Sequence, residues 1–488
     1  VIAQGGTELA VGVGGSGGGG GNAGAVRVTR GANTASRIVT LGNQVAGLAA
    51  QSVGGGGGNA GVNIVFEAST QVTGGGTNQA RLAVGGSGGT PGDGSTVDVD
   101  HTGDIITEGD SAFGLLAQSV GGGGGNANIN FSKSLNRGGA KPAGASYSLA
   151  VGGGTGNGGD GGDVAVVHAG DISTAGDDAT ALFAQSVGGG GGNAEADDSA
   201  LGSFLDAVDI AADAFSDTKR SVDIEIGRSG GTGGDGGDVA VSSDGRLVTR
   251  GERAVGIRAQ SVGAGGGVSG TTSASFSGSS EISLQVGVGG ATGGRAGNVR
   301  VDAAGLIATE GTDAHAIHAQ SVGGGGGEGG SVGGSLMPSG NSVSVGVGGS
   351  GGTGGVSGTV EVTNAASLVT QGDGAYGIHA QSIGGGGGDG GYAGITQDDT
   401  YGAAVDLVMG AVDGGLTEGG TQLSALVGGN GGVGALADRV TVANTGMVLT
   451  SGREAHGINA QSIGGGGGVG GIVMNGTVTM GSGNNSMA

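Results

Sequence analysis

The sequence predicts an all-β fold, an elongated parallel β-solenoid (β-helix) of seven repeats. Three observations predict it: the tripeptide Ala-Gln-Ser occurs seven times, aliphatic residues stand at fixed distances before it, and glycine-rich runs separate the aliphatic segments. Glycine supplies 133 of the 488 residues, against an average share of about 7%. A flexible linker has no reason to keep aliphatic residues at fixed distances, so we expect an ordered array.

The glutamine of each tripeptide marks one copy of the repeat, and successive glutamines are 67, 67, 75, 60, 61 and 80 residues apart. These glutamines are Gln51, Gln118, Gln185, Gln260, Gln320, Gln381 and Gln461. We interpret residues 1–488 as one continuous array and as a fragment of a longer chain. The repeats end near Gly58, Gly125, Gly192, Gly267, Gly327, Gly388 and Gly468.

A block of fixed length precedes each glutamine. Leu or Ile stands three residues before it, valine stands nineteen before it in six repeats, and Val or Ile stands a further fifteen back. Threonine stands eleven before it, at Thr40, Thr107, Thr174, Thr249, Thr309, Thr370 and Thr450. A slip of one residue would turn a strand's side chains to the other face. We therefore expect the Leu/Ile column to be buried and the valines to form an internal ladder.

Short alternating runs within the block predict strands. In the sixth repeat these are TVEV (359–362), SLVTQ (367–371) and YGIHAQSI (376–383), which are rich in β-branched residues and separated by turns. Such strands can stack on the next coil by parallel pairing. We expect about two coils per repeat, one from the fixed block and one from the glycine-rich and variable stretches.

The glycine runs predict a second kind of element. Stretches such as GGSGGTGG carry another residue at every third place, and three residues per turn is the polyproline II period. A flat, close-packed glycine strand is the alternative. In both cases bare backbones lie against one another, and the glutamine amide either caps that contact or lies exposed at a corner. Because Ala264 occupies the second of the five places in the fourth repeat, we expect alanine to be tolerated at Gly324 and harmful at Gly325 or Gly326.

Two variable stretches have helical spacing. Residues 199–217 and 403–412 place apolar residues on one side of a helix. We expect short helical insertions packed on the side of the solenoid in preference to helices that bind a partner.

Composition argues against several functions. The net charge is −23 and the 18 Lys and Arg residues are not clustered, so we expect no nucleic acid partner. The chain has no cysteine, and we find no apolar run long enough for a membrane span. No known catalytic motif is present, and the histidine columns also accept Val, Tyr, Arg and Asn. We therefore expect no enzyme activity and no cofactor.

One acidic motif is a weak candidate for calcium. GGDGGDVAV occurs at 158–166 and 233–241 and matches half of a calcium-binding nonapeptide. The candidate ligands are Asp160, Asp163, Asp235 and Asp238. The motif is not in tandem, and other repeats replace these residues with Ala, Val, Ser or Asn, so solvated turns are the preferred interpretation.

The stretches TEGTDAHAIHAQSVGGGGGEGG (309–330), TQGDGAYGIHAQSIGGGGGDGG (370–391) and TSGREAHGINAQSIGGGGGVGG (450–471) carry a family resemblance. They resemble the glycine-rich repeats of very large proteobacterial autotransporter-type (type V secreted) surface proteins. The resemblance implies a secreted passenger, a β-helix stalk, an extracellular place on a bacterial cell, and an outer-membrane barrel that anchors the parent chain. The glycine triplets also resemble the polyglycine II sandwiches at the tips of some phage tail fibres.

We expect a structural role without catalysis, as a stalk, fibre or adhesive region. The candidate partners are other copies of the chain and the surface of a host or neighbouring cell. The alternative is a specific binding module for a glycan, a receptor or ice. Ice binding would require several flat threonine arrays, whereas the block contains one threonine column.

Overall fold

The computed structural model describes residues 7–31, 37–61, 63–70, 78–127, 130–137, 145–194, 220–273, 280–333, 341–394, 422–474 and 486–487. Every regular element within these ranges is a β-strand, and equivalent strands of neighbouring repeats pair in parallel. The prediction of an all-β parallel solenoid is therefore confirmed. The proposed helical insertions 199–217 and 403–412 lie outside the described residues.

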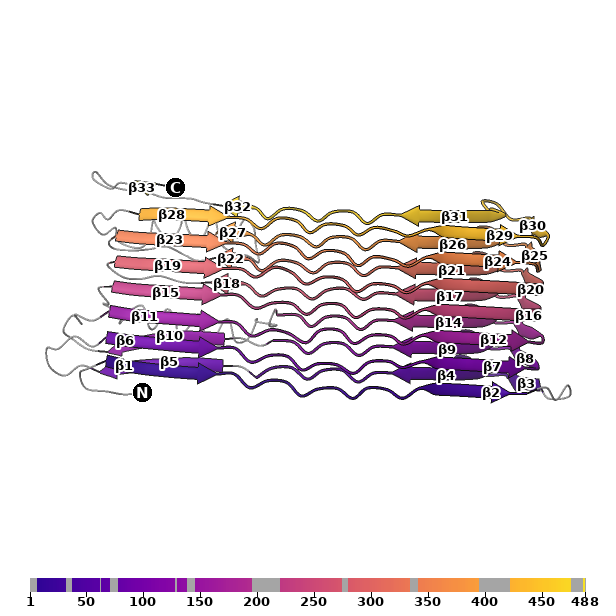
Figure 1. Ribbon diagram of the computed structural model, residues 1–488, viewed down its shortest axis with the longest axis horizontal. Helices are drawn as coiled ribbons and strands as arrows, with labels where there is room; N and C mark the ends of the chain where they lie inside the picture. The colour runs from indigo at the N-terminus through magenta and orange to yellow at the C-terminus, as the bar shows by residue number, and fades with distance from the viewer. Residues whose placement is uncertain are drawn as a thin grey trace.

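One coil can be followed in the fifth repeat (Figure 1). It begins with β19 (Ser280–Val286) at the left of the view and crosses to the right through the glycine-rich residues 287–298, the outgoing segment. At the right, β20 (Val299–Thr309) and β21 (Ile317–Val322) fold back on each other around a tight turn. Residues 323–331, the return segment, lead back to β22 (Val332–Gly333).

The left-hand end holds three sheets. The 8-stranded sheet contains β1 (Thr7–Val13), β6 (Asn78–Val84), β11 (Ala145–Val151), β15 (Arg220–Ile226), β19, β23 (Asn341–Val347), β28 (Gln422–Val427) and β33 (Ser486–Met487). The other two sheets pair β5 (Asn63–Thr70) with β10 (Asn130–Arg137), and β18 (Thr272–Ser273), β22, β27 (Ala393–Gly394) and β32 (Val473–Met474).

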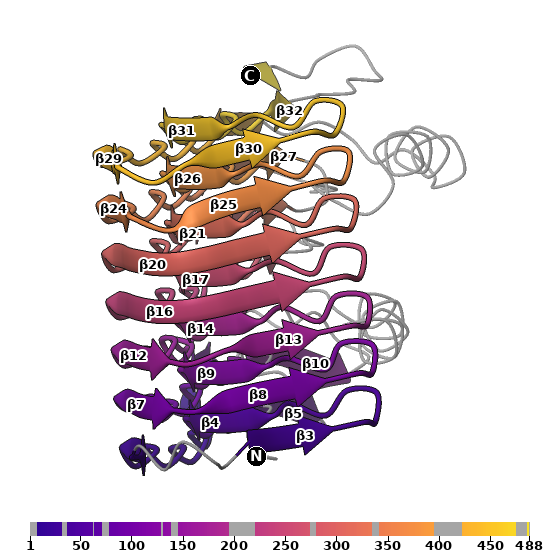
Figure 2. The ribbon, with the colours of Figure 1, turned by 90° about the vertical axis from the view of Figure 1, so that its right-hand side faces the viewer.

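The right-hand end holds two sheets, stacked as Figure 2 shows. The 12-stranded sheet contains β2 (Val26–Arg30), β3 (Arg37–Thr40), β7 (Val97–Thr102), β8 (Asp104–Thr107), β12 (Val164–Ala169), β13 (Ile172–Thr174), β16 (Val239–Thr249), β20, β24 (Val360–Asn364), β25 (Ser367–Thr370), β29 (Val440–Asn444) and β30 (Val448–Thr450). The 7-stranded sheet contains β4 (Leu48–Val53), β9 (Leu115–Val120), β14 (Leu182–Val187), β17 (Ile257–Val262), β21, β26 (Ile378–Ile383) and β31 (Ile458–Ile463).

The register shows one coil per repeat. Each strand pairs with the strand at the same place in the next repeat, so that Gln260 lies opposite Gln320 and Gln320 opposite Gln381. The expectation of two coils per repeat is wrong, because the fixed block and the glycine runs belong to the same turn. Seven coils about 4.8 Å apart rise by only roughly 34 Å. The longest dimension therefore lies across the coils (Figure 1).

The hydrophobic core lies between the two right-hand sheets. Its Leu/Ile column is fully buried in the middle coils, with 0% exposure at Leu182, Ile317 and Ile378, so this prediction is confirmed. The valines nineteen residues before the glutamines also join the core. The valines a further fifteen back do not. They lie in the 8-stranded sheet, where Val286 and Val347 are half-buried and Ile226 is 38% exposed in the middle coils, so an internal ladder was wrong for that column.

Candidate functional site: the polyglycine lattice and its side-chain ladders

Hydrogen bonds in the glycine segments recur at every third residue. In the fifth coil the N–H groups of Gly323, Gly326 and Gly329 donate to carbonyls of the sixth coil, the first at the end of β26 and the other two in the return segment, each at 2.8 Å. The next residues in line, Gly324 and Gly327, donate to the outgoing segment at 2.9 and 2.7 Å. This is the polyproline II period. A flat strand would instead alternate its side chains with a period of two.

The third residue of each turn faces outward, which makes the middle glycine of the five different from its neighbours. Gly325 is exposed, and a Cβ added there would come no closer than 3.9 Å to Gly386 O. A Cβ on Gly324 or Gly326 would overlap the backbone of Ala264 or Gly352. The geometry therefore supports damage at Gly326 and contradicts the expected damage at Gly325. At Gly324 the overlap argues against the expected tolerance, although Ala264 occupies the same place in the fourth coil.

The seven glutamines form one continuous amide ladder. Each Nε2 donates to the Oε1 of the glutamine in the next coil, at distances between 2.6 and 3.3 Å. The ladder lies on the outer side of the 7-stranded sheet, where the middle glutamines are half-buried. The expectation that the amide caps the glycine contact is wrong, because the amides bond to one another. Such a ladder ties each coil to both of its neighbours.

The serine that follows each glutamine performs the capping that we expected of the glutamine. Ser321 Oγ donates to Gly297 O at 2.9 Å and accepts from the N–H of Gly358 at 2.8 Å. It is 0% exposed and joins the end of a strand to the outgoing segments of two coils. Our sequence reasoning missed this residue, although its presence in all seven tripeptides was a signal. The same pair of bonds recurs at Ser119, Ser186 and Ser261.

The threonine column closes the tight turn. Thr309 Oγ1 donates to Ala314 O at 2.5 Å, and the column repeats this bond at Thr107, Thr174, Thr249, Thr370 and Thr450 at 2.5–2.9 Å. Between donor and acceptor stands a residue with positive φ, 54° at Asp313, which is the left-handed region that non-glycine residues seldom adopt. The buried hydroxyl therefore stabilises a strained turn.

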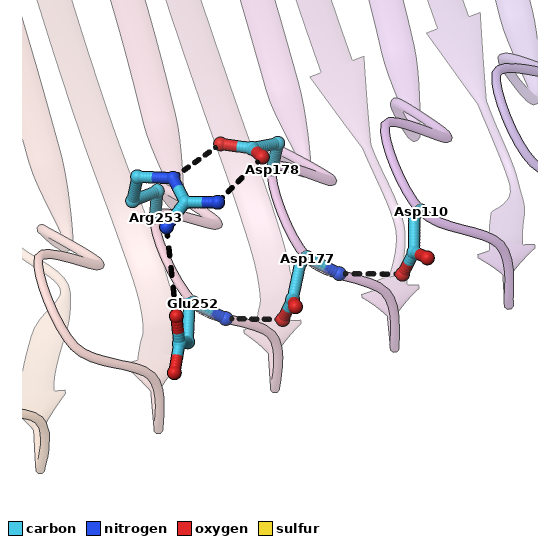
Figure 3. A network of polar contacts seen from close by, with 5 residues as sticks. All are labelled: Asp110, Asp177, Asp178, Glu252 and Arg253. Atoms are coloured by element: carbon cyan, nitrogen blue, oxygen red, sulfur yellow. Dashed lines mark hydrogen bonds and ion pairs between the residues drawn. The ribbon is translucent and has the colours of Figure 1, made fainter.

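Exposed acidic side chains also bond from coil to coil. Figure 3 shows the backbone N–H of Asp177 donating to Asp110 at 3.1 Å and that of Glu252 donating to Asp177 at 2.8 Å. Arg253 adds a two-pronged ion pair to Asp178, at 2.8 Å on both oxygens. The guanidinium holds the pKa of Asp178 below its usual value. Exposed pairs of this kind contribute little to stability.

The four calcium candidates belong to such ladders. Asp160 accepts the N–H of Asp235 at 2.8 Å, and Asp163 accepts the N–H of Asp238 at the same distance. The two Asp columns are separate, and each of the four carboxylates accepts a hydrogen bond from a backbone N–H of the next coil. Within the described ranges, no group of three or more His, Asp or Glu side chains has an arrangement that could hold a metal ion.

Imidazole and aromatic rings form a strip on the 7-stranded sheet and its turns. His318 stacks on His379 with ring centroids 5.0 Å apart, His315 stacks on Tyr376 at 4.9 Å, and Tyr376 contacts His456 at 5.2 Å. Burial lowers the pKa of His318 to about 3 and that of His315 to about 4. Both ring nitrogens of His318 are buried without a hydrogen-bond partner. His315 and His318 are therefore neutral at pH 7 and serve as packing groups.

A second histidine pair is buried inside the 12-stranded sheet. His101 and His168 are 0% and 1% exposed, and their Nδ1 atoms are 3.1 Å apart. Burial, and secondarily the charge of His101, lowers the pKa of His168 to about 4. The histidine columns that also accept Val, Tyr, Arg and Asn are those of His315 and His318, and they do not include this pair. One ring donates to the other when both are neutral.

No protein-family model, curated protein or solved structure matches this chain. The residues that the structure describes form strands and no helix, so none of them belongs to a helix that could span a membrane.

Proposed function

We propose that this chain is a structural extracellular segment of a bacterial surface protein, serving as a stalk, fibre or adhesive region of the autotransporter type. The observation that carries the proposal is the choice of hydrogen-bond partners by the repeated polar residues. The Gln, Ser and Thr columns direct their side-chain bonds to neighbouring coils or to their own turn. A scaffold requires such bonds, whereas a catalytic centre requires polar groups that converge on a free site.

Labelling of intact cells tests the cellular part of the proposal. An antibody raised against the purified array should bind intact cells of the bacterium that encodes it, and external protease should remove the signal. Labelling that requires permeabilised cells would contradict an extracellular role.

Deletion of one repeat tests the structural part. Removing residues 261–320 joins Gln260 to Ser321, and because Gln260 lies opposite Gln320 in the register, the strand continues in phase. Each coil contacts its neighbours alone in an array of this kind, so the shortened protein should fold and reach the cell surface. Loss of folding or of display would show that the fifth coil has a role beyond stacking.

A specific binding module remains the second candidate, because one face of the lattice displays a regular polar array. Thr90, Thr232, Thr292 and Thr353 are exposed on the outgoing segments, with Asn157 at the equivalent place in the third coil. This exposed column is separate from the buried threonine column of the fixed block. Assays of ice recrystallisation and of glycan-array binding test the alternative, and inactivity of the purified chain in both would remove it.

A further inference from the structure

The 8-stranded sheet at the left-hand end has its apolar side facing outward. In β19, Ile282 and Leu284 are 53% and 37% exposed, whereas the alternating Ser283 and Gln285 are 3% and 5% exposed. The inward side packs toward β5 in the first coils, where Ala10 and Ala83 contact Val65. Ser283 Oγ and Gln285 Nε2 are buried without a hydrogen-bond partner. The sheet therefore presents the side that a globular protein would normally bury.

This outer apolar face continues through every coil. We define it as the positions in register with Leu9, Val11 and Val13 in the seven strands from β1 to β28. All of them are Ala, Val, Leu, Ile or Tyr, and none is charged. The acidic residues of the sheet alternate with them and point to the other side, as Asp223 and Glu225 do in β15. The face is a charge-free area on a chain with net charge −23.

The size of the face lies at the small end of what a specific pair of copies needs. Seven strands about 4.8 Å apart, with five residues at about 3.3 Å each, cover roughly 560 Å². Two copies would bury about 1,100 Å², close to the lower limit of about 1,200 Å² for stable specific interfaces. Two sheets can pack face to face at about 10 Å when both present apolar side chains.

We propose that the outer apolar face binds the same face of a second copy, so that two solenoids pair side by side. An identical copy has the same strand spacing and the same lack of charge over the whole length of the contact, and carboxylates of the two chains stay outside it. A lipid surface is the less suitable occupant, because the face offers Tyr147 as its single interfacial aromatic residue and contains no Lys or Arg, and Arg220 at the start of β15 is the one such residue in register beside it. This pairing does not depend on the proposed cell-surface role.

Sedimentation velocity of the 488-residue protein over a range of concentrations tests the pairing, with Ile282→Asp as the disrupting variant. Ile282 is half exposed in the single copy, so the variant should fold, but pairing would bury its charge. We expect a wild-type dimer and a Kd at least about 30-fold weaker in the variant, the size of an interface hot spot. Val167→Asp is the matched control, because Val167 is 52% exposed in β12 at the other end of the coil. It should leave the dimer intact.

Each other outcome would overturn the proposal. A wild-type monomer up to roughly 100 µM would lie outside the range of specific interfaces of this size. A dimer that Ile282→Asp and Val167→Asp weaken equally, or that neither weakens, would use another surface. A monomer that floats with phosphatidylethanolamine–phosphatidylglycerol vesicles, and loses this property in Ile282→Asp, would identify a lipid surface as the occupant. Circular dichroism of the three proteins establishes that all are folded.

Discussion

Replacing neighbouring glycines of one run by alanine should give effects of opposite sign. In Gly326→Ala the new Cβ would overlap the carbonyl of Gly352 and approach the N of Gly388 to 2.9 Å. These are backbone atoms of two other segments and cannot move aside as a side chain can. Overpacking of this kind costs about 1–3 kcal/mol, and the stiffer unfolded chain returns about 0.4–1 kcal/mol. The variant should therefore lose up to about 2.6 kcal/mol of unfolding free energy, and about 1.3 kcal/mol at the midpoints of the two ranges.

Gly325→Ala is the matched control, one residue away. Its Cβ points to solvent, with the nearest atom 3.9 Å away, so only the unfolded-state term remains and the variant should gain about 0.4–1 kcal/mol. Denaturant melts of the two variants, followed by circular dichroism, measure the difference. Equal destabilisation would show that Gly325 is enclosed. Two neutral variants would show that the run is not packed backbone against backbone, and the lattice would be refuted.

Four further changes test the ladders and the titrating groups. Gln320→Leu breaks two side-chain hydrogen bonds and leaves the half-buried neighbouring amides with one bond fewer each. Denaturant melts should therefore show a loss of about 1–3 kcal/mol of unfolding free energy, and an unchanged midpoint would mean that the ladder adds no stability. Thr309→Val should cost a similar amount by orphaning a buried carbonyl, whereas Thr309→Ser should be milder, and equal losses would point to packing instead. The buried imidazoles stay neutral while those of the unfolded chain protonate below about 6.5, so stability should fall as the pH drops from about 6.5 toward 4. The double variant His318→Phe/His379→Phe should flatten this pH dependence. Phe fits the site because Phe183 already occupies the same column. An unaltered pH profile would mean that other groups cause the pH dependence. Excess chelator should leave the melting temperature unchanged, because the four candidate aspartates bond to backbone donors; a large drop would establish a calcium site.

The right-hand end of each coil could be predicted from the sequence because its signals are local. Alternation of period two places Ile378, Ala380 and Ser382 on one side of a strand, and all three are fully buried. The predicted strands of the sixth repeat correspond to β24, β25 and β26 within a few residues. The distances from the glutamine are fixed because each position pairs with the equivalent position in the next coil.

The coil count and the capping roles could not be predicted, because they depend on which segments meet in space. Glycine has no side chain to show which way it faces, so the run alone did not reveal that Gly325 faces solvent while Gly324 and Gly326 face other backbones. The outward direction of the apolar side of β19 also contradicts the rule that alternating apolar residues face a core. Ser321 escaped notice because its two partners lie in distant segments.

Hydrogen exchange of the individual amides in residues 323–330 tests the polyglycine lattice most directly. The N–H groups of Gly323, Gly324, Gly326, Gly327, Gly329 and Gly330 donate hydrogen bonds to other segments, whereas Gly325 and Glu328 face solvent. The lattice therefore predicts protection at two of every three amides, with fast exchange at Gly325 and Glu328. Alternate protection with a period of two would indicate a flat strand, and fast exchange throughout would indicate a free linker; either pattern would contradict the lattice.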